Sequence, residues 1–258
     1  MAAAALVTGG SSGIGLEFAK LLAAKGFVPV LVSNRPDELE SAAANIRREF
    51  GIEAPTLCID LAEKGAGEKL LSCCDEKGIS PEIVVCNAGM FFMEYLNPGN
   101  LPKARTMMAL HMDCTTDICV LFGSRMKERG SGRIIIMSSM TARIPAPGIA
   151  IYSASKAYLK SFGQSLSYEL RPFGVYVTTV RPSAIDTGLY PLGDGLRRFL
   201  KGIGVIRSPR YLASRALRAS ERGRRSIAPG FTNILVPLLV AMLPSRLIDR
   251  LGKKWIMK

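Results

Sequence analysis

Short apolar runs alternate with amphipathic segments along most of this chain. The runs lie at residues 5–9, 28–33, 54–60, 82–89, 132–139 and 175–180. Between them apolar residues recur at helical spacing, and the longest helix is expected over residues 101–128. Runs that are apolar on both faces and separated by helices are typical of a parallel sheet covered on both sides. The sequence therefore predicts a single α/β domain, a Rossmann-like doubly wound parallel sheet.

Composition excludes several other classes of protein. The 258 residues are 48% hydrophobic and 21% charged, which is enough apolar material for a core and rules out wholesale disorder. The N-terminus MAAAALVTGG has neither a basic region nor a long apolar region, so no secretory signal is expected. The six cysteines lack the spacing and the partner histidines of a zinc site. We therefore expect reduced thiols, no metal and a cytoplasmic location.

The net charge of +13 is concentrated at the C-terminal end. Residues 1–196 hold 19 basic and 19 acidic residues, whereas residues 197–258 hold 15 basic and two acidic ones. Within this end, residues 231–244 form an apolar run of 14 residues, shorter than the roughly 20 that a membrane-spanning helix needs. This run belongs to a basic and apolar C-terminal segment, residues 229–258. The run is predicted to be a helix that faces the core or a partner subunit, or a segment that lies in a membrane interface.

A glycine-rich turn follows the first apolar run. It reads TGGSSGIG over residues 8–15, and its candidate ligand-binding residues are Gly9, Ser11, Ser12, Gly13, Ile14 and Gly15. Glycine permits a sharp turn and a close approach of the backbone to a pyrophosphate. The helix that begins near Gly13 presents unpaired N–H groups and its positive dipole end to the phosphates. The turn could also merely connect strand and helix, but its place after the first strand favours dinucleotide binding.

The end of the second apolar run bears on the choice of cofactor. A site that prefers NAD has an acidic residue there, which accepts from the ribose 2′-hydroxyl. This chain has Ser33, Asn34 and Arg35, with no carboxylate before Asp37. Arg35 could pair with a 2′-phosphate, and the sequence shows nothing nearby that would repel it. The pattern favours NADP(H), against the alternative of a solvated arginine in a turn.

Three residues suggest acid–base chemistry on a carbonyl oxygen. Tyr152 and Lys156 are four residues apart in YSASK, so they share one helix face. A phenol titrates near 10 in water, and a neighbouring ammonium favours its ionised form. Ser139 ends the run at 132–139 and could hold the same oxygen. The spacing of Tyr and Lys alone is common, but combined with the glycine-rich turn and Ser139 it indicates a catalytic group.

In these motifs the chain resembles the short-chain dehydrogenase/reductase family along nearly its whole length. The matching elements are residues 8–15, Asp60-Leu61, Asn87-Ala88-Gly89, the spacing of 13 residues between Ser139 and Tyr152, and YSASK at 152–156. The resemblance implies that Tyr152 is the catalytic acid/base, that Ser139 positions the substrate carbonyl, and that Lys156 lowers the pKa of the tyrosine. It also implies further cofactor contacts, by Asp60, Leu61, Asn87, Ala88, Gly89, Tyr152, Lys156, Ile185 and Thr187.

Two positions depart from the family pattern. Pro182 is followed by Ser183, where the family usually has glycine. The family's catalytic asparagine aligns with His111, the only histidine of the chain. In the family, the backbone carbonyl of that residue holds a water that relays protons to the lysine. His111 could keep this backbone role, its imidazole could join the relay because it titrates near neutrality, or it could fill the site passively.

The resemblance also points to a substrate class. Residues 188–207 correspond to a mobile substrate lid, and apolar residues recur there at positions 196, 199, 200 and 203. This predicts a hydrophobic ketone or alcohol, such as a 3-oxoacyl chain or a steroid. The C-terminal segment is similar to that of a subset of the family that includes very-long-chain 3-oxoacyl reductases and related bacterial oxidoreductases. The alternative is a catalytically degenerate dinucleotide-binding sensor or interaction protein. A homo-oligomer and peripheral membrane contact are the expected partners, and nucleic acid is not expected.

Overall fold

The apolar runs form the strands of one parallel sheet in the computed structural model. The structure describes residues 2–144, 146–183, 185–186, 206–230, 232–244 and 246–248, together with Gly195 and Arg198. The strands are β1 (Ala4–Thr8), β2 (Val28–Ser33), β3 (Thr56–Cys58), β4 (Pro81–Cys86), β5 (Gly132–Met137), β6 (Val175–Val180) and β7 (Ser226–Ile227). Their order is β3-β2-β1-β4-β5-β6-β7, and every neighbouring pair is parallel. The predicted α/β doubly wound fold is confirmed.

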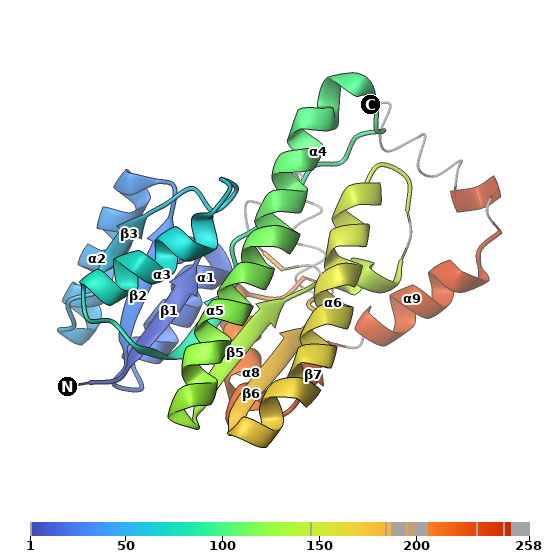
Figure 1. Ribbon diagram of the computed structural model, residues 1–258. Coiled ribbons are helices and arrows are strands. Elements are labelled where there is room, and N and C mark those ends of the chain that lie inside the picture. The colour runs from blue at the N-terminus through green and yellow to red at the C-terminus, as the bar shows by residue number, and fades with distance from the viewer. Residues whose placement is uncertain are drawn as a thin grey trace.

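Helices cover both faces of the sheet (Figure 1). One face carries α1 (Gly13–Ala23), α2 (Pro36–Phe50) and α8 (Pro209–Glu221), and the other carries α3 (Ala66–Glu76), α5 (Cys114–Arg129) and α6 (Ala150–Leu170). Alternation along a strand divides the core: Leu6 packs toward α3 and α5, whereas Ala5 and Val7 pack toward α1 and α8. Both sides of the sheet are therefore buried, as the runs without polar alternation predict.

The long helix predicted over residues 101–128 is present, but a π-helical turn interrupts it. The structure has α4 (Leu101–Met108), a π-helical turn (Ala109–Asp113) and then α5. A π turn inserts one residue into a helix and often marks a functional site. His111 lies in this turn and is fully buried. The irregularity therefore lies at the one position of this helix where the sequence departs from the family pattern.

The C-terminal region contains elements that the sequence analysis does not predict individually. α8 begins with Ser208, whose hydroxyl accepts from the Tyr211 N–H at 3.2 Å, and with Pro209 at its first position. The two-residue strand β7 follows. α9 (Thr232–Met242) contacts the 3₁₀ turn at Met140–Arg143 and lies at the edge of the molecule (Figure 1). No helix in the described ranges is long and apolar enough to cross a membrane. The predicted lid at 188–207 lies almost wholly outside the described residues.

Candidate active site

A cleft of about 560 Å³ opens at the carboxyl ends of the central strands. The chain proceeds from β1 outward through β2 to β3 and then returns to the other side of β1 with β4. Such a switch point leaves a crevice outside the sheet, where open α/β proteins bind their ligands. The residues predicted for cofactor and catalysis line this cleft as follows: Gly9, Ser11, Ser12, Gly13, Ile14, Arg35, Asp60, Leu61, Asn87, Ala88, Gly89, His111, Ser139, Tyr152, Lys156 and Ile185.

Gly15 is the described cofactor candidate that does not line the cleft. Gly15 lies behind the glycine-rich turn, where a Cβ would overlap the carbonyl oxygen of Gly9. Its role is therefore to let helix α1 pack closely against the turn. Thr187 lies outside the described residues.

The glycine-rich turn leaves the first turn of α1 open toward the cleft. Gly9 has a φ of 63°, a backbone conformation that favours glycine. Ser12 is the N-cap of α1, but its side chain makes no capping hydrogen bond, and the first turn has no acidic residue. The N–H groups of this turn thus lack the side-chain partners that usually satisfy them. They are arranged to receive an anionic group at the positive end of the helix dipole.

Asn87 and Thr8 join the ends of β1 and β4 beneath this turn. The Asn87 amide nitrogen donates to the Thr8 carbonyl at 3.0 Å, and the backbone N–H groups of Asn87 and Ala88 both donate to Thr8 Oγ1, at 2.9 and 3.0 Å. Thr8 Oγ1 in turn donates to the Val85 carbonyl at 3.2 Å. These bonds hold the floor of the cleft in one geometry, because each buried polar group has a partner.

Arg35 lies at the far end of the cleft and has a carboxylate partner. Its guanidinium pairs with Glu38 at 2.7 Å, and Ser11 Oγ donates to the same carboxylate at 3.1 Å. The bond from Arg35 holds the pKa of Glu38 below its ordinary value. The expectation that nothing near Arg35 would repel a 2′-phosphate is therefore wrong, because the Glu38 carboxylate lies beside it. The spacing of three residues between them on a helix could have indicated this pair from the sequence.

Tyr152, Lys156 and Ser139 lie together in the cleft. All three are at least nine-tenths buried. Lys156 Nζ lies 5.7 Å from the centre of the Tyr152 ring and donates to the Met137 carbonyl at 3.0 Å. Ser139 Oγ accepts from the Thr141 N–H at 3.1 Å and from the Thr141 hydroxyl at 2.9 Å. Because its oxygen accepts two hydrogen bonds, the Ser139 hydroxyl can donate its own proton to a third group.

Burial changes the acidity of the lysine. Removal from water lowers the pKa of Lys156 from 10.5 to about 8. Loss of hydration disfavours the charged form of an amine. The amine can therefore exchange a proton near neutral pH, while its bond to Met137 fixes its position.

His111 is held by hydrogen bonds on both ring nitrogens. Nε2 accepts from the Met90 N–H at 3.1 Å, so the proton is on Nδ1, which lies 2.9 Å from Ser155 Oγ. Ser155 then donates to the Tyr152 carbonyl at 2.9 Å. Burial, and secondarily the charge of Lys156, holds the pKa of His111 well below its ordinary value. The expectation that this imidazole titrates near neutrality is wrong, and its ring is neutral and fixed.

The segment between β4 and α4 forms an apolar wall beside the tyrosine. The Phe91 ring contacts the Tyr152 ring edge-on, with centroids 4.9 Å apart. Phe92 packs in the same cluster, with Met107 of α4. None of the wall residues is distinguished in the sequence, because apolar residues in a loop form no periodic pattern.

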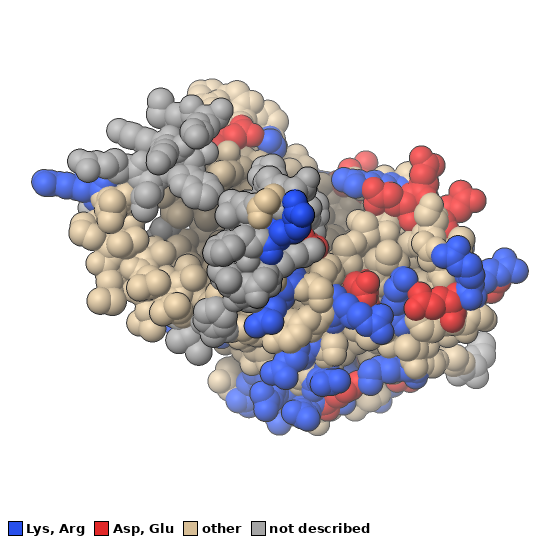
Figure 2. Space-filling model, turned by 180° about the vertical axis from the view of Figure 1, so that it is seen from behind, with Lys and Arg blue, Asp and Glu red and all other residues tan. Residues whose placement is uncertain are grey.

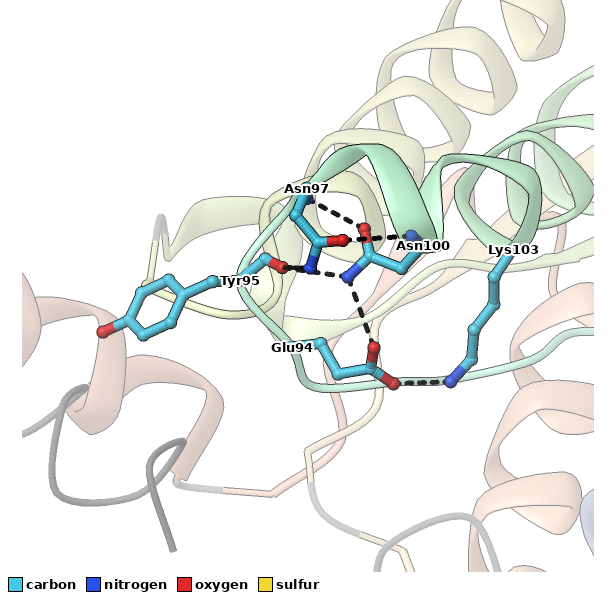
Figure 3. A network of polar contacts seen from close by, with 5 residues as sticks. All are labelled: Glu94, Tyr95, Asn97, Asn100 and Lys103. Carbon is cyan, nitrogen blue, oxygen red and sulfur yellow. Dashed lines mark hydrogen bonds and ion pairs between the residues drawn. The ribbon is translucent and has the colours of Figure 1, made fainter.

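A polar network anchors this wall to the start of α4 (Figure 3). Glu94 accepts from Lys103 at 2.6 Å and from Asn100 at 3.3 Å, and Asn100 also donates to the Tyr95 carbonyl at 2.9 Å. Asn97 caps the same turn by accepting from the Gly99 N–H at 2.8 Å. The Glu94 N–H reaches across to the Gly148 carbonyl at 2.9 Å. The network thus ties together the two loops that lie on either side of Tyr152.

Ser183 fits its place without backbone strain. No residue other than glycine has a positive φ within the described ranges, so the position does not need the glycine that the family usually has. The side chain is buried and lies close to Gly230, where a Cβ would come within 3.5 Å of its hydroxyl oxygen. Pro182, just before it, accepts from the Met140 N–H at 2.8 Å. This segment therefore still closes the cleft beside Ser139.

The cleft suits a dinucleotide along its whole length. The open first turn of α1 and the close contact of Gly15 with Gly9 provide for a pyrophosphate. The two halves of a bound dinucleotide would have different surroundings. One half would lie near Arg35, and the other near the cluster of Tyr152, Lys156 and Ser139. Fold and site together define a dinucleotide-dependent oxidoreductase.

Comparison with known proteins agrees with this class. The family model for short chain dehydrogenases matches residues 3–191. The chain belongs to the short-chain dehydrogenase/reductase family and is an enzyme of that family.

Individual relatives and structures extend the comparison. The chain is 32% identical over 191 residues to the very-long-chain 3-oxoacyl-CoA reductase of Mus musculus, covering 72% of this chain and 60% of that one. The corresponding reductase of Phaeosphaeria nodorum is 35% identical over 191 residues, covering 72% and 55%. This chain therefore spans about 60% of the length of such relatives. A short-chain dehydrogenase from Sphingobium yanoikuyae, solved with NADPH, aligns with a TM-score of 0.79 and 26% identity, covering 95% and 94%.

Proposed function

We propose that this enzyme uses NADP(H) to interconvert a ketone and a secondary alcohol on a hydrophobic substrate, a 3-oxoacyl or steroid-like compound. The observation that carries the proposal is the convergence of Tyr152, Lys156 and Ser139 in one buried cluster at the end of a dinucleotide-shaped cleft. A complete set of acid–base groups does not favour the alternative of a degenerate sensor. The apolar wall of Phe91 and Phe92 beside Tyr152 supports an apolar substrate, and the names of the relatives favour a 3-oxoacyl chain.

The three side chains have separable roles in this reaction. The nicotinamide cofactor, when bound, supplies or accepts the hydride. Ser139 donates a hydrogen bond to the substrate oxygen and so fixes the carbonyl in place. Tyr152 gives its proton to that oxygen during reduction and takes it back during oxidation. Lys156 stabilises the resulting phenolate by its charge.

His111 and Ser155 position these groups. The chain of hydrogen bonds from the Met90 N–H through His111 and Ser155 to the Tyr152 carbonyl joins the apolar wall to the first turn of α6. Because the imidazole is neutral and both of its nitrogens form hydrogen bonds, it orients its neighbours and supplies no charge. We therefore assign His111 to the positioning of Tyr152 and of the wall.

Substitution of the tyrosine tests the proposed reaction. Tyr152→Phe removes the proton donor and should lower ketone reduction by roughly 10²–10⁴-fold, the usual contribution of a general acid. Activity is measured as NADPH oxidation with a panel of 3-oxoacyl thioesters, steroids and simple ketones. Tyr168→Phe, an exposed tyrosine on the same helix, is the control and should retain activity. NADPH binding, followed by fluorescence, should be retained in both variants. Turnover by Tyr152→Phe at the wild-type rate would refute the assignment.

Substitution of the arginine tests the choice of cofactor. The pair between Arg35 and Glu38 is exposed, and such pairs contribute little to stability, so the guanidinium can turn to a 2′-phosphate. Arg35→Ala should weaken NADPH binding by about tenfold, as expected for a charge-assisted hydrogen bond, and leave NADH binding within about twofold. Arg48→Ala, an exposed arginine on α2, the helix that Arg35 precedes, serves as the control. Equal losses for the two cofactors in Arg35→Ala would contradict a preference for NADP(H).

A further inference from the structure

A second hollow lies on the flank of the molecule away from the cleft. It has a volume of about 340 Å³ and is formed by the C-terminal half of α8 and the edge strand β7, with Arg215, Arg218, Arg222, Arg224, Ala219, Ser226, Ile227, Ala228 and Pro229 as its lining. Because α8 connects two parallel strands, it runs back along the sheet, and its C-terminal half lies toward the amino ends of the strands. The volume falls near the lower end of the range for small-molecule sites, about 300–1,000 Å³.

Four arginines surround this hollow, and no carboxylate lines it. Figure 2 shows Lys and Arg side chains gathered along the lower part of the face that α8 covers. Within the described ranges, none of the four guanidinium groups of the hollow forms an ion pair. Glu221, the acidic residue at this end of α8, pairs instead with Lys25 at 2.8 Å. The hollow therefore carries a local excess of positive charge.

The spacing of the arginines on α8 lowers the stability of the helix. Arg215 and Arg218 are three residues apart, and Arg218 and Arg222 are four apart, so like charges are neighbours on one helix face. Such pairs destabilise a helix. The helix dipole accounts for cations in its last turn, which applies to Arg218 and Arg222. It does not account for Arg215, one turn earlier, or for Arg224 on the following loop.

The edge strand adds a backbone donor to the guanidinium groups. The carbonyl groups of Arg225 and Ile227 accept from the N–H groups of Thr179 and Arg181 of the neighbouring strand, both at 2.9 Å. Alternate residues of a strand point their N–H and C=O groups to opposite sides. Ser226, between these two residues, therefore presents its N–H to the open edge of the sheet, where the hollow lies.

We propose that this hollow binds a phosphate-bearing anion. Arginine forks match phosphate oxygens in pairs, and a backbone N–H at a sheet edge complements them. A bound dianion would also relieve the repulsion among Arg215, Arg218 and Arg222. The phosphate can belong to a soluble phosphate ester or to a lipid headgroup with a terminal phosphate. The proposal does not depend on the reaction assigned to the cleft.

Calorimetric titration with pyrophosphate tests the site. The protein is held in an excess of NAD⁺, which occupies the dinucleotide cleft and carries no phosphate monoester that would compete with the probe for the hollow. Wild type should bind pyrophosphate, and the double variant Arg215→Gln/Arg222→Gln should bind it at least tenfold more weakly. The matched control is Lys69→Gln/Lys77→Gln, which removes equal charge from exposed lysines on α3 and at its C-cap, on the other face of the sheet, and should stay within twofold of wild type. Circular dichroism verifies the fold of each variant, and Tyr152→Phe should bind like wild type.

Vesicles distinguish the two sources of phosphate. Flotation compares phosphatidylcholine vesicles containing phosphatidic acid with vesicles of equal charge containing phosphatidylglycerol. A preference for phosphatidic acid that is lost in Arg215→Gln/Arg222→Gln supports a lipid headgroup as the source. Pyrophosphate binding without that preference supports a soluble phosphate ester. The proposal is overturned if wild type does not bind pyrophosphate. It is also overturned if Arg215→Gln/Arg222→Gln and the control variant weaken pyrophosphate binding equally.

Discussion

Lys156 is a buried amine whose protonation is coupled to folding. Its pKa is lowered to about 8 in the folded protein from 10.5 in water. Between these two pH values the unfolded chain binds more protons, so the contribution of this group to the free energy of unfolding rises with pH across that window. Below pH 8, burial of the charged amine lowers the free energy of unfolding by an amount on the order of 3 kcal/mol.

Comparison of wild type with Lys156→Met isolates this effect. The free energy of unfolding, measured by urea titration at several pH values, should rise in wild type relative to the variant between about pH 8 and 10.5. Buried thiols act in the opposite direction, since burial raises the pKa of Cys74 to about 11. They are present in both proteins and cancel in the difference. A difference between the two proteins that does not change with pH would contradict the proposed desolvation of the amine.

The sequence predicts which residues converge in the cleft better than it predicts their partners. The motif containing Tyr152 and Lys156 and the strand-end Ser139 are recognisable because each lies at a fixed place in a regular element. The partner of His111 Nε2 is the backbone N–H of Met90, 21 residues away in a loop. Such a contact depends on how a loop returns to a helix, which no local pattern specifies.

Helix α6 carries Tyr152 and Lys156 and lies directly on β6. Close contact is possible because residue 163 is glycine: a Cβ there would overlap Thr179 Oγ1 and lie 3.0 Å from Ile136 Cδ1. Helix propensity alone would favour alanine by about 1 kcal/mol. Overpacking against two strands typically costs about 1–3 kcal/mol. We expect Gly163→Ala to lower the free energy of unfolding, because the clash exceeds the gain in propensity.

Gly123→Ala is the matched substitution on the neighbouring helix α5. There a Cβ would meet only the ends of flexible side chains, at 3.2 Å from Leu170 Cδ1 and 3.7 Å from Ile134 Cδ1. The propensity term should therefore dominate, and stability should be unchanged or higher in urea unfolding. If Gly163→Ala proved as stable as Gly123→Ala, the close packing of α6 against the sheet would not depend on glycine at residue 163.

Among the secondary-structure elements, the regular ones were predictable from the sequence and the irregular ones were not. β2, β6 and the start of α2 coincide with the apolar runs and with Pro36, because buried strands and helix starts have strong local signals. The π turn arises where His111 bonds to two other segments, and β7 is only two residues long. α8 did carry a signal, since Ser208-Pro209 followed by apolar residues at 212, 213, 216 and 217 is typical of a capped amphipathic helix.

At the scale of the whole molecule, the distribution of apolar surface argues against a core position for α9. Leu235, Leu238, Leu239 and Met242 lie on one helix face at a spacing of three and four residues, and all are exposed, Met242 by 79%. The core alternative predicted for residues 231–244 is therefore wrong for this face. The residues that follow are basic in the sequence, including Arg246, Arg250, Lys253 and Lys254. An apolar face next to basic residues is typical of segments that lie on anionic lipid.

We therefore expect the protein to float with phosphatidylglycerol vesicles at low salt and to be released at high salt, because each basic residue near the surface contributes about 1 kcal/mol that salt screens. Leu238→Asp/Leu239→Asp should abolish flotation, since it places carboxylates on the inserted face. Val120→Asp/Leu101→Asp makes the same chemical change at exposed apolar positions of α5 and α4 and should float like wild type. Light scattering supplies the decisive contrast: if wild type stays in the soluble fraction and the α9 variant converts a dimer to a monomer, this face is a subunit interface and does not bind lipid.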